Sequence, residues 1–306
     1  MKINTNKYKC TLGILIIGLI FSLISCKKND DNTVDNTSST TDATTGVAPA
    51  QEVASLILKE IAEFTKGNYT FYLYRKTSAG IITGYNEIYV QVKNNVSGNY
   101  VQDASLSWYP LLHKISAPAS AISKVSGTNT IYKGYIIFLT SCTDTATEYW
   151  QLTVNYTSGT DTLARASSKL YVTEPTYKRL NVLQSAVDGQ QYIIALVEPT
   201  TAVVGSDVIT AYVYNTVSSY SFALVPNYKI LIDPRMPDMA NMGSSGNVNL
   251  SYDSATGLYK GTVNFSMTGY WEVGLILENA SNQVLLGNEI NDNDTTASTI
   301  YFEFGL

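Results

Sequence analysis

The chain has 306 residues, of which 45% are hydrophobic and 15% charged, and its formal net charge is −5. A single histidine excludes a multi-histidine metal site, and there is neither a Gly-rich phosphate loop nor a Cys-x-x-Cys pair. The negative charge offers no basic surface to nucleic acid. The composition therefore argues against most common enzymes and against nucleic-acid binding, and we expect a non-enzymatic protein.

The first 25 residues are predicted to be a lipoprotein signal peptide. Three lysines precede an apolar run, residues 12–24, that is too short to cross a bilayer as a helix. Its end, Leu23-Ile24-Ser25-Cys26, resembles the lipobox of bacterial lipoproteins. The resemblance implies that the thiol of Cys26 is acylated, that Cys26 begins the mature chain, and that the lipid holds the protein on a membrane surface.

Residues 26–50 are predicted to be a disordered tether, because Thr, Ser, Asp and Asn dominate them. Their start, Lys27-Lys28-Asn29-Asp30-Asp31, resembles the export signal of surface-displayed lipoproteins in the Bacteroides group. We therefore expect a lipid anchor in the outer membrane, with the protein facing the periplasm or the cell surface. The signal removes three of the 20 basic residues and none of the 25 acidic ones, so the mature net charge is −8.

The three cysteines are predicted to have separate fates. Cys10 leaves with the signal and Cys26 carries the lipid, so Cys142 is the only thiol of the body and no intramolecular disulfide forms. Because no cationic residue neighbours Cys142 in the sequence, we expect this thiol to be unreactive.

From residue 51 onward the pattern is that of β-strands separated by Gly, Asn, Ser and Pro. Residues 51–65 fit either a short helix or a first strand, because their apolar residues have near-helical spacing. Strands are predicted at Tyr69–Arg75 and at residues 87–93, 132–139, 149–155, 192–197, 208–215, 257–267, 270–277 and 299–304. This spacing predicts an all-β protein of two tandem immunoglobulin-like β-sandwiches, residues 51–175 and 176–306.

An internal repeat links the two halves. Tyr132-Lys133-Gly134 recurs as Tyr259-Lys260-Gly261, and Pro110 and Pro237 share the same offset of 127. Tyr149-Trp150 recurs as Tyr270-Trp271, with six extra residues in the preceding turn of the first copy, and residues 88–94 match residues 209–215. We infer an ancestral duplication with its boundary near residues 173–176.

Strand alternation predicts which side chains are buried. One face of the strand at residues 257–267 carries Tyr259, Gly261, Val263, Phe265 and Met267. We therefore expect Met267 to pack in the core. Trp150 and Trp271 hold equivalent positions in the repeat, so both are predicted to anchor a core between two sheets.

Residues 233–246 are predicted to be a loop, because they include two prolines and two glycines. They contain Met236, Met239 and Met242 at a spacing of three. Thioether sulfur is soft and uncharged, so three such donors suit Cu(I). Alternatively, the three methionines are adaptable packing residues that cover the open end of the sandwich.

The second half resembles the FixH/YtkA-like family over about residues 188–304. The resemblance is carried by Asp233-Pro-Arg-Met-Pro-Asp-Met239, Tyr259-Lys-Gly261, the segment from Phe265 to Trp271, Ala195-Leu-Val-Glu-Pro199 and residues 207–214. It implies an immunoglobulin-like fold in the bacterial envelope and a link to copper handling. The family often carries a His after the Met-Pro-x-Met core, where Asn241 and Met242 stand here, and this departure argues against divalent copper.

The first half is predicted to be a degenerate and mainly structural copy. Leu112 and Ile115 align with Met239 and Met242, so this copy lacks the sulfur donors. His113, beside Leu112, is either a solvated loop residue or an accessory metal ligand.

The sequence thus predicts a membrane-anchored envelope lipoprotein whose second sandwich binds Cu(I) through Met236, Met239 and Met242. Met267 and His113 are the accessory candidates. No ordered EF-hand spacing relates the acidic residues of the last turn, Glu289, Asp292 and Asp294.

The alternative function is a cell-surface glycan-binding or adhesion module, or a scaffold that presents sheet edges. Sugar binding needs exposed aromatic side chains. Of the three tryptophans, only Trp108 is not assigned to a core, and it stands with Tyr109 in a predicted loop before Pro110.

Overall fold

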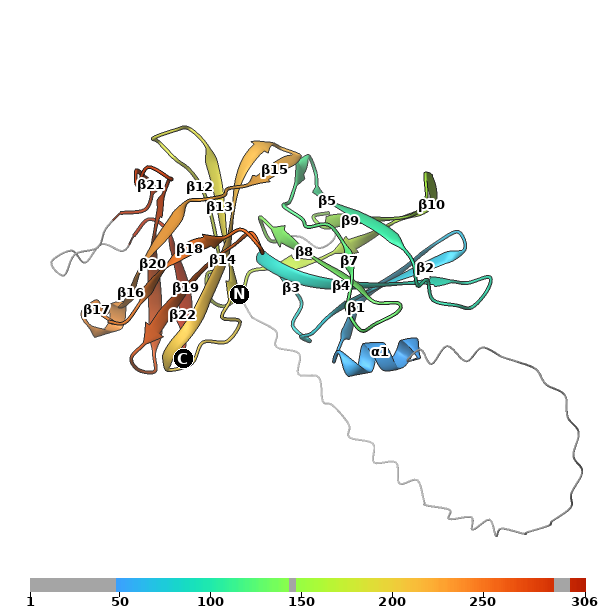
Figure 1. Ribbon diagram of the computed structural model, residues 1–306, viewed down its shortest axis with the longest axis horizontal. Helices are drawn as coiled ribbons and strands as arrows, with labels where there is room; N and C mark the ends of the chain where they lie inside the picture. The colour runs from blue at the N-terminus through green and yellow to red at the C-terminus, as the bar shows by residue number, and fades with distance from the viewer. Residues whose placement is uncertain (1–47, 143–146, 289–297) are drawn as a thin grey trace, which may run out of the picture. The chain divides into compact units, whose positions relative to one another are not determined.

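The computed structural model describes residues 48–142, 147–288 and 298–306, and most of them lie in β-strands (Figure 1). The predicted signal, Cys26, nearly all of the tether and the residues Glu289, Asp292 and Asp294 lie outside this part. Within the described ranges, no helix is long and apolar enough to cross a membrane.

The elements are α1 (Pro49–Ser55), β1 (Lys59–Lys66), β2 (Tyr69–Arg75), β3 (Ile81–Ile82), β4 (Gly84–Asn94), β5 (Ser105–Leu112), β6 (Ile115–Ser116), β7 (Ser123–Lys124), β8 (Tyr132–Phe138), β9 (Trp150–Ser158), β10 (Asp161–Leu170), β11 (Val172–Thr173), β12 (Leu180–Gln184), β13 (Gln191–Glu198), β14 (Gly205–Ser218), β15 (Ser221–Leu224), β16 (Lys229–Met236), the 3-10 helix η1 (Pro237–Met239), β17 (Met242–Gly243), β18 (Val248–Asp253), β19 (Leu258–Phe265), β20 (Tyr270–Glu278), β21 (Val284–Leu286) and β22 (Tyr301–Gly305).

Two antiparallel sheets enclose the core of the first half. One has the order β1-β2-β4-β8-β7 and the other β10-β9-β5-β6, while β3 and β11 form a short parallel pair. Alternate residues of both sheets meet in one cluster, in which Phe71, Ile88, Phe138 and Trp150 are fully buried. Burial of one face of each sheet against the other defines a β-sandwich.

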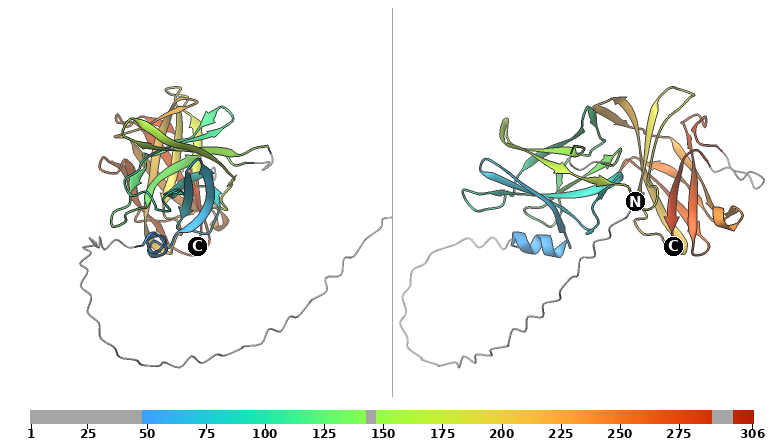
Figure 2. Two further views of the ribbon diagram at one scale, coloured as in Figure 1. Left: turned by 90° about the vertical axis from the view of Figure 1, so that its right-hand side faces the viewer. Right: turned by 180° about the vertical axis from the view of Figure 1, so that it is seen from behind.

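The strands of the second half, β12 to β22, form one 11-stranded sheet around a second core (Figure 2). The strand β18 joins the two layers of this sandwich, because it pairs with both β19 and β16. On the other side the layers are linked by Asn181 of β12, whose side-chain amide bonds the carbonyl and the N–H of Tyr301 in β22. The all-β, sandwich-type fold predicted from the sequence is confirmed.

The tryptophans Trp150 and Trp271 occupy matching places in the two cores, and both are fully buried. The ring of Trp150 meets Phe138 edge-on at 5.1 Å, and that of Trp271 meets Phe265 edge-on at 5.7 Å. Each indole N–H donates to the carbonyl two residues after that phenylalanine, at 3.0 and 3.1 Å. The prediction that both tryptophans anchor a core is confirmed. The duplication itself stays a prediction, with which this shared geometry agrees.

A third apolar cluster, here called the inter-sandwich layer, lies between strands of the first and second halves. It contains Ile137 from β8, Ile193 and Ala195 from β13, and Tyr212 and Tyr214 from β14. The alternate residues of β13 fill the second core instead. Because β13 is buried on both faces, its sequence is an uninterrupted apolar run. The alternation of polar and apolar residues therefore does not show which of its side chains enter the second core and which enter the inter-sandwich layer.

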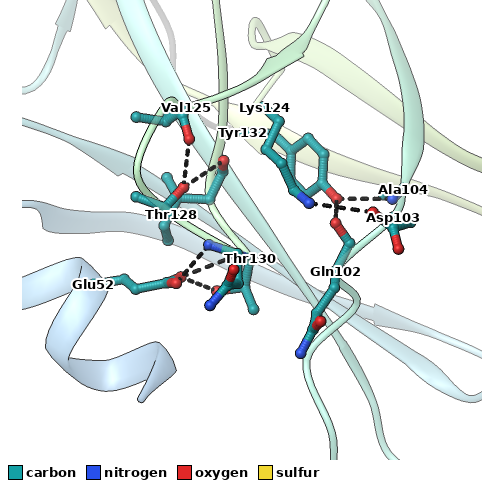
Figure 3. Close-up of polar contacts among 11 residues, drawn as sticks. Glu52, Gln102, Asp103, Ala104, Lys124, Val125, Thr128, Thr130 and Tyr132 are labelled. Carbon is teal, nitrogen blue, oxygen red and sulfur yellow. Dashed lines mark hydrogen bonds and ion pairs between the residues drawn. The ribbon is translucent and has the colours of Figure 1, made fainter. Parts of the chain in front are cut away.

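Residues 51–65 contain both structures that their pattern allowed, a short helix followed by a strand. The helix α1 stops before Ile57, which has a φ of 55°. Glu52 of α1 is 1% exposed. Its carboxylate accepts hydrogen bonds from the N–H of Asn129 at 2.6 Å and from the N–H of Thr130 at 3.0 Å. The Thr130 hydroxyl donates a third bond to the same carboxylate (Figure 3). The carboxylate therefore fastens α1 to the turn that precedes β8.

The predicted loop around Trp108 and Tyr109 is wrong, because both residues belong to β5. Pro110 suggested a break in the chain, but it pairs with Leu152 of β9 inside the strand. Its carbonyl accepts a hydrogen bond from the Ser116 hydroxyl at 2.8 Å, on the side away from β9. The absent N–H of the proline points to that same side, so the ladder between β5 and β9 continues.

Candidate functional site: a methionine hairpin

The methionines of the predicted site lie on a hairpin formed by β16, η1 and β17, here called the methionine hairpin (Figure 1). The prediction of a loop over residues 233–246 is wrong at its start, because β16 continues to Met236. Pro234 does not end the strand, since its carbonyl faces Ser244 at 3.4 Å and its missing N–H faces the same side. Pairing with β20 therefore proceeds through Asp233 and Arg235.

Met236 and Met242 are directly opposite each other in the antiparallel pair of β16 and β17. Opposite residues of such a pair have Cβ atoms about 4.5–5.5 Å apart on the same face. Met236 is 3% exposed and belongs to the core of the second sandwich, while Met242 is half-buried and packs against that core. The structure thus brings these two thioether side chains together.

Gly269 makes room for the buried methionine. A Cβ atom built on Gly269 would lie 2.6 Å from Cε of Met236, and the φ of Gly269 is +139°. Any larger residue at position 269 would displace the methyl end of Met236. Sequence reasoning missed Gly269, although a glycine two residues before the core tryptophan was a visible signal.

Met239 lies in the turn of the hairpin and is 51% exposed. The turn is made by η1 and by Ala240 and Asn241, whose φ angles are 52° and 60°. Arg235 braces it from the strand, because its guanidinium bonds the Asp233 carboxylate at 2.8 Å and the Asn241 carbonyl at 3.4 Å. Met239 is therefore presented to solvent by a turn that is bonded to Arg235 of β16.

Met267 does not pack in the core, and that prediction is wrong. The strand β19 ends at Phe265, so Met267 lies in the following turn, with 38% of its surface exposed. Its carbonyl accepts a hydrogen bond from the indole N–H of Trp271 at 3.1 Å. Met267 precedes Gly269 by two residues. The helix η1 packs against β20, which begins after this turn. Met267 thus belongs to the neighbourhood of the methionine hairpin.

Strand register corrects the sequence alignment of the two halves. Leu112 and Ile115 are cross-strand partners in the β5–β6 hairpin, so they correspond to Met236 and Met242. The second hairpin has three more residues in its turn, and Met239 has no counterpart. By the same register, Pro110, opposite Leu152, corresponds to Pro234, opposite Val273, and not to Pro237. An alignment without gaps cannot detect this insertion.

His113 lies in the two-residue turn of the β5–β6 hairpin, with a φ of 53° and an exposed side chain. It is on a different hairpin from the methionines.

Cys142 is a free, half-buried thiol that packs against the first core.

The methionine hairpin supplies sulfur and few hard donors. In the described ranges, no group of three or more His, Cys, Asp or Glu side chains is arranged to hold a metal ion. The Oδ2 atom of Asp233 is buried without a hydrogen-bond partner. It belongs to the alternate face of β16 from Met236, because successive side chains of a strand point to opposite faces. The side chains that the structure brings together here are therefore mainly thioethers, which are soft ligands.

Comparisons with known proteins give a family match in the second half of the chain. The comparison with curated proteins found no match. Among solved structures, the chain is similar to a crystal structure of a DUF4785 family protein from Legionella pneumophila, with 8% identity and a TM-score of 0.25. That similarity covers 72% of this chain and about half, 55%, of the other. The family model described as YtkA-like matches residues 187–275, which include Met236, Met239, Met242 and Met267. The resemblance of the second half to this family is therefore confirmed over residues 187–275.

Proposed function

We propose that the chain is a non-enzymatic bacterial envelope lipoprotein, anchored through a lipid on Cys26, whose methionine hairpin holds a Cu(I) ion. The observation that carries the copper assignment is the cross-strand pairing of Met236 with Met242. Two sulfur-bearing side chains of the same face are thereby adjacent without any conformational change, and Met239 follows in the connecting turn.

The donor set fits Cu(I) on chemical grounds. Thioethers need no deprotonation, and soft sulfur donors favour Cu(I) over hard cations such as Mg²⁺ and Ca²⁺. Met242 and Met239 are accessible, and Met236 adds a donor at the edge of the core. Met267 is the accessory candidate, because it lies in the turn that contains Gly269. His113 is not included, because it is in the turn of the other hairpin.

Core packing is the competing explanation, since Met236 belongs to the buried cluster. The first half of the chain offers a matched replacement. Leu112 and Ile115 hold the corresponding hairpin positions, so Met236→Leu with Met242→Ile should preserve the fold while it removes two sulfur atoms.

A Cu(I) competition titration tests the copper assignment. The full-length protein in detergent is titrated against a chromogenic Cu(I) chelator, next to the Met236→Leu/Met242→Ile variant and a Met239→Leu variant. We expect the wild type to withdraw copper from the chelator and the double variant to lose this ability, with unchanged unfolding temperature. Equal competition by all three proteins, or no competition by any, contradicts the proposal.

The lipid anchor is tested separately. Cells that express the full chain are fed a labelled fatty acid, and label in the purified protein is compared with that in a Cys26→Ser variant. We expect label in the wild type alone. Label retained after Cys26→Ser would place the acyl group elsewhere and rule out this anchor.

A further inference from the structure

A second candidate site lies away from the methionine hairpin, where β5 and β6 meet the β14–β15 hairpin. The N–H of Ser116 donates to the carbonyl of Ser219 at 2.9 Å, and this bond joins the two segments. Beside it is a pocket of about 230 Å³, lined by both halves of the chain. Small-molecule pockets in proteins occupy roughly 300–1,000 Å³, so this one suits a ligand no larger than a single ring.

The pocket is uncharged and aromatic. None of the residues that line it is Asp, Glu, Lys, Arg or His, whereas Trp108, Tyr109, Tyr214, Tyr220 and Phe222 all contribute. This absence of charge offers no counter-ion to a phosphate, a carboxylate or an amine. A neutral ligand is therefore the class that the lining favours.

Some polar groups of the pocket are occupied and others are free. The indole N–H of Trp108 donates to the Ser120 carbonyl at 2.8 Å, and the Tyr214 hydroxyl is 2.7 Å from another tyrosine hydroxyl. By contrast, the hydroxyls of Tyr109 and Tyr220 have no hydrogen-bond partner within the described part of the chain, and these side chains are 38% and 53% exposed. The pocket thus has two accessible aromatic rings, each with an unused hydroxyl.

We propose that this pocket binds one ring of a neutral saccharide. A pyranose has a face of C–H groups, which packs on an aromatic ring, and a rim of hydroxyls, which needs donors and acceptors such as tyrosine O–H groups. Tyr109 and Tyr220 supply both properties on the two halves of the chain. The proposal is independent of copper binding, because it uses none of the methionines.

The experiment uses an array of neutral and acidic glycans with the full-length protein in detergent, followed by calorimetric titration of the neutral glycans that bind. The variants are Tyr109→Ala, Tyr220→Ala and Tyr220→Phe. Tyr171→Ala is the matched control, because Tyr171 is 47% exposed and does not line the pocket.

We expect neutral glycans to bind and each pocket alanine variant to weaken binding by about tenfold, which is the scale of one lost aromatic contact. Tyr220→Phe should retain most of the affinity, and Tyr171→Ala all of it. Absence of neutral-glycan binding at millimolar concentration, preference for acidic glycans, or equal affinity of wild type and both alanine variants would each overturn the proposal.

Discussion

The hydroxyl oxygens of Tyr135 and Tyr214 lie 2.7 Å apart, and they join β8 of the first half to β14 of the second. The ring of Tyr135 also stacks on Tyr212 at 4.5 Å. Burial raises the pKa of Tyr135 and raises that of Tyr214 to about 12, so both hydroxyls are protonated at neutral pH and one donates to the other. This pair is a polar contact within the inter-sandwich layer.

Removal of one hydroxyl should cost more than removal of both. Tyr135→Phe leaves the Tyr214 hydroxyl buried without a partner, and we expect a loss of about 1–3 kcal/mol in the free energy of unfolding. The double variant Tyr135→Phe/Tyr214→Phe should recover part of this loss, because the Tyr214 hydroxyl is removed together with its partner. Urea denaturation of the four proteins of this cycle measures the coupling, and strictly additive losses would contradict the arrangement.

Gly261 should not tolerate a side chain. A Cβ atom there would clash with the carbonyl oxygen of Val248 and lie 3.1 Å from the backbone of Asn249, and backbone cannot move aside as a flexible side chain can. We expect Gly261→Ala to lower the free energy of unfolding by about 1–3 kcal/mol. Gly80→Ala is the control, because nothing lies within 4 Å of its Cβ position. Equal thermal stability of the two variants would argue against the close approach of β18 to β19.

The buried carboxylate of Glu52 should be needed to hold α1. In Glu52→Gln an amide N–H group replaces one oxygen that accepts from Asn129 or Thr130, so at least one bond is lost. We expect a loss of about 1–3 kcal/mol in the free energy of unfolding and faster proteolysis near α1. Glu63→Gln, at an exposed position of β1, should behave as wild type. If both variants resist protease equally, α1 is held by other contacts.

Asp253 should titrate far below an ordinary aspartate. A hydrogen bond from Lys260, with further bonds from the Ala255 N–H and the Thr256 hydroxyl, lowers its pKa from 3.8 to about 2. Because the folded-state pKa is depressed, the carboxylate stabilises the β18–β19 turn fully above about pH 3.8. The contribution is lost as the pH falls from that value towards 2.

Carboxyl-detected NMR titration measures this pKa directly. We expect Lys260→Met to raise the pKa of Asp253 towards 3.8, and Lys229→Met, at the Asn282 contact, to leave it unchanged. A midpoint near 3.8 in the wild type would show that the Lys260 contact does not persist in solution.

Much of the fold was predictable from local patterns. The strand Tyr69–Arg75 has the bounds expected from its residues, and Trp150 and Trp271 are buried as the repeat indicated. These features depend on alternation and on large apolar side chains, which act over a few residues. Pro110 and Pro234 misled the strand assignment, because whether a proline interrupts a ladder depends on which side its missing N–H faces.

Local sequence patterns predicted that the chain forms β-sandwiches with tryptophan anchors and that four of its five methionines cluster in the second half. Local patterns did not predict that Met236 faces Met242, that Met267 lies outside the core or that Tyr109 and Tyr220 line one pocket. The physical reason is that strand register and the packing of one sheet on another bring together residues far apart in the chain. A one-residue shift in register would move every side chain of a strand to the opposite face of its sheet, and no local pattern specifies the register completely.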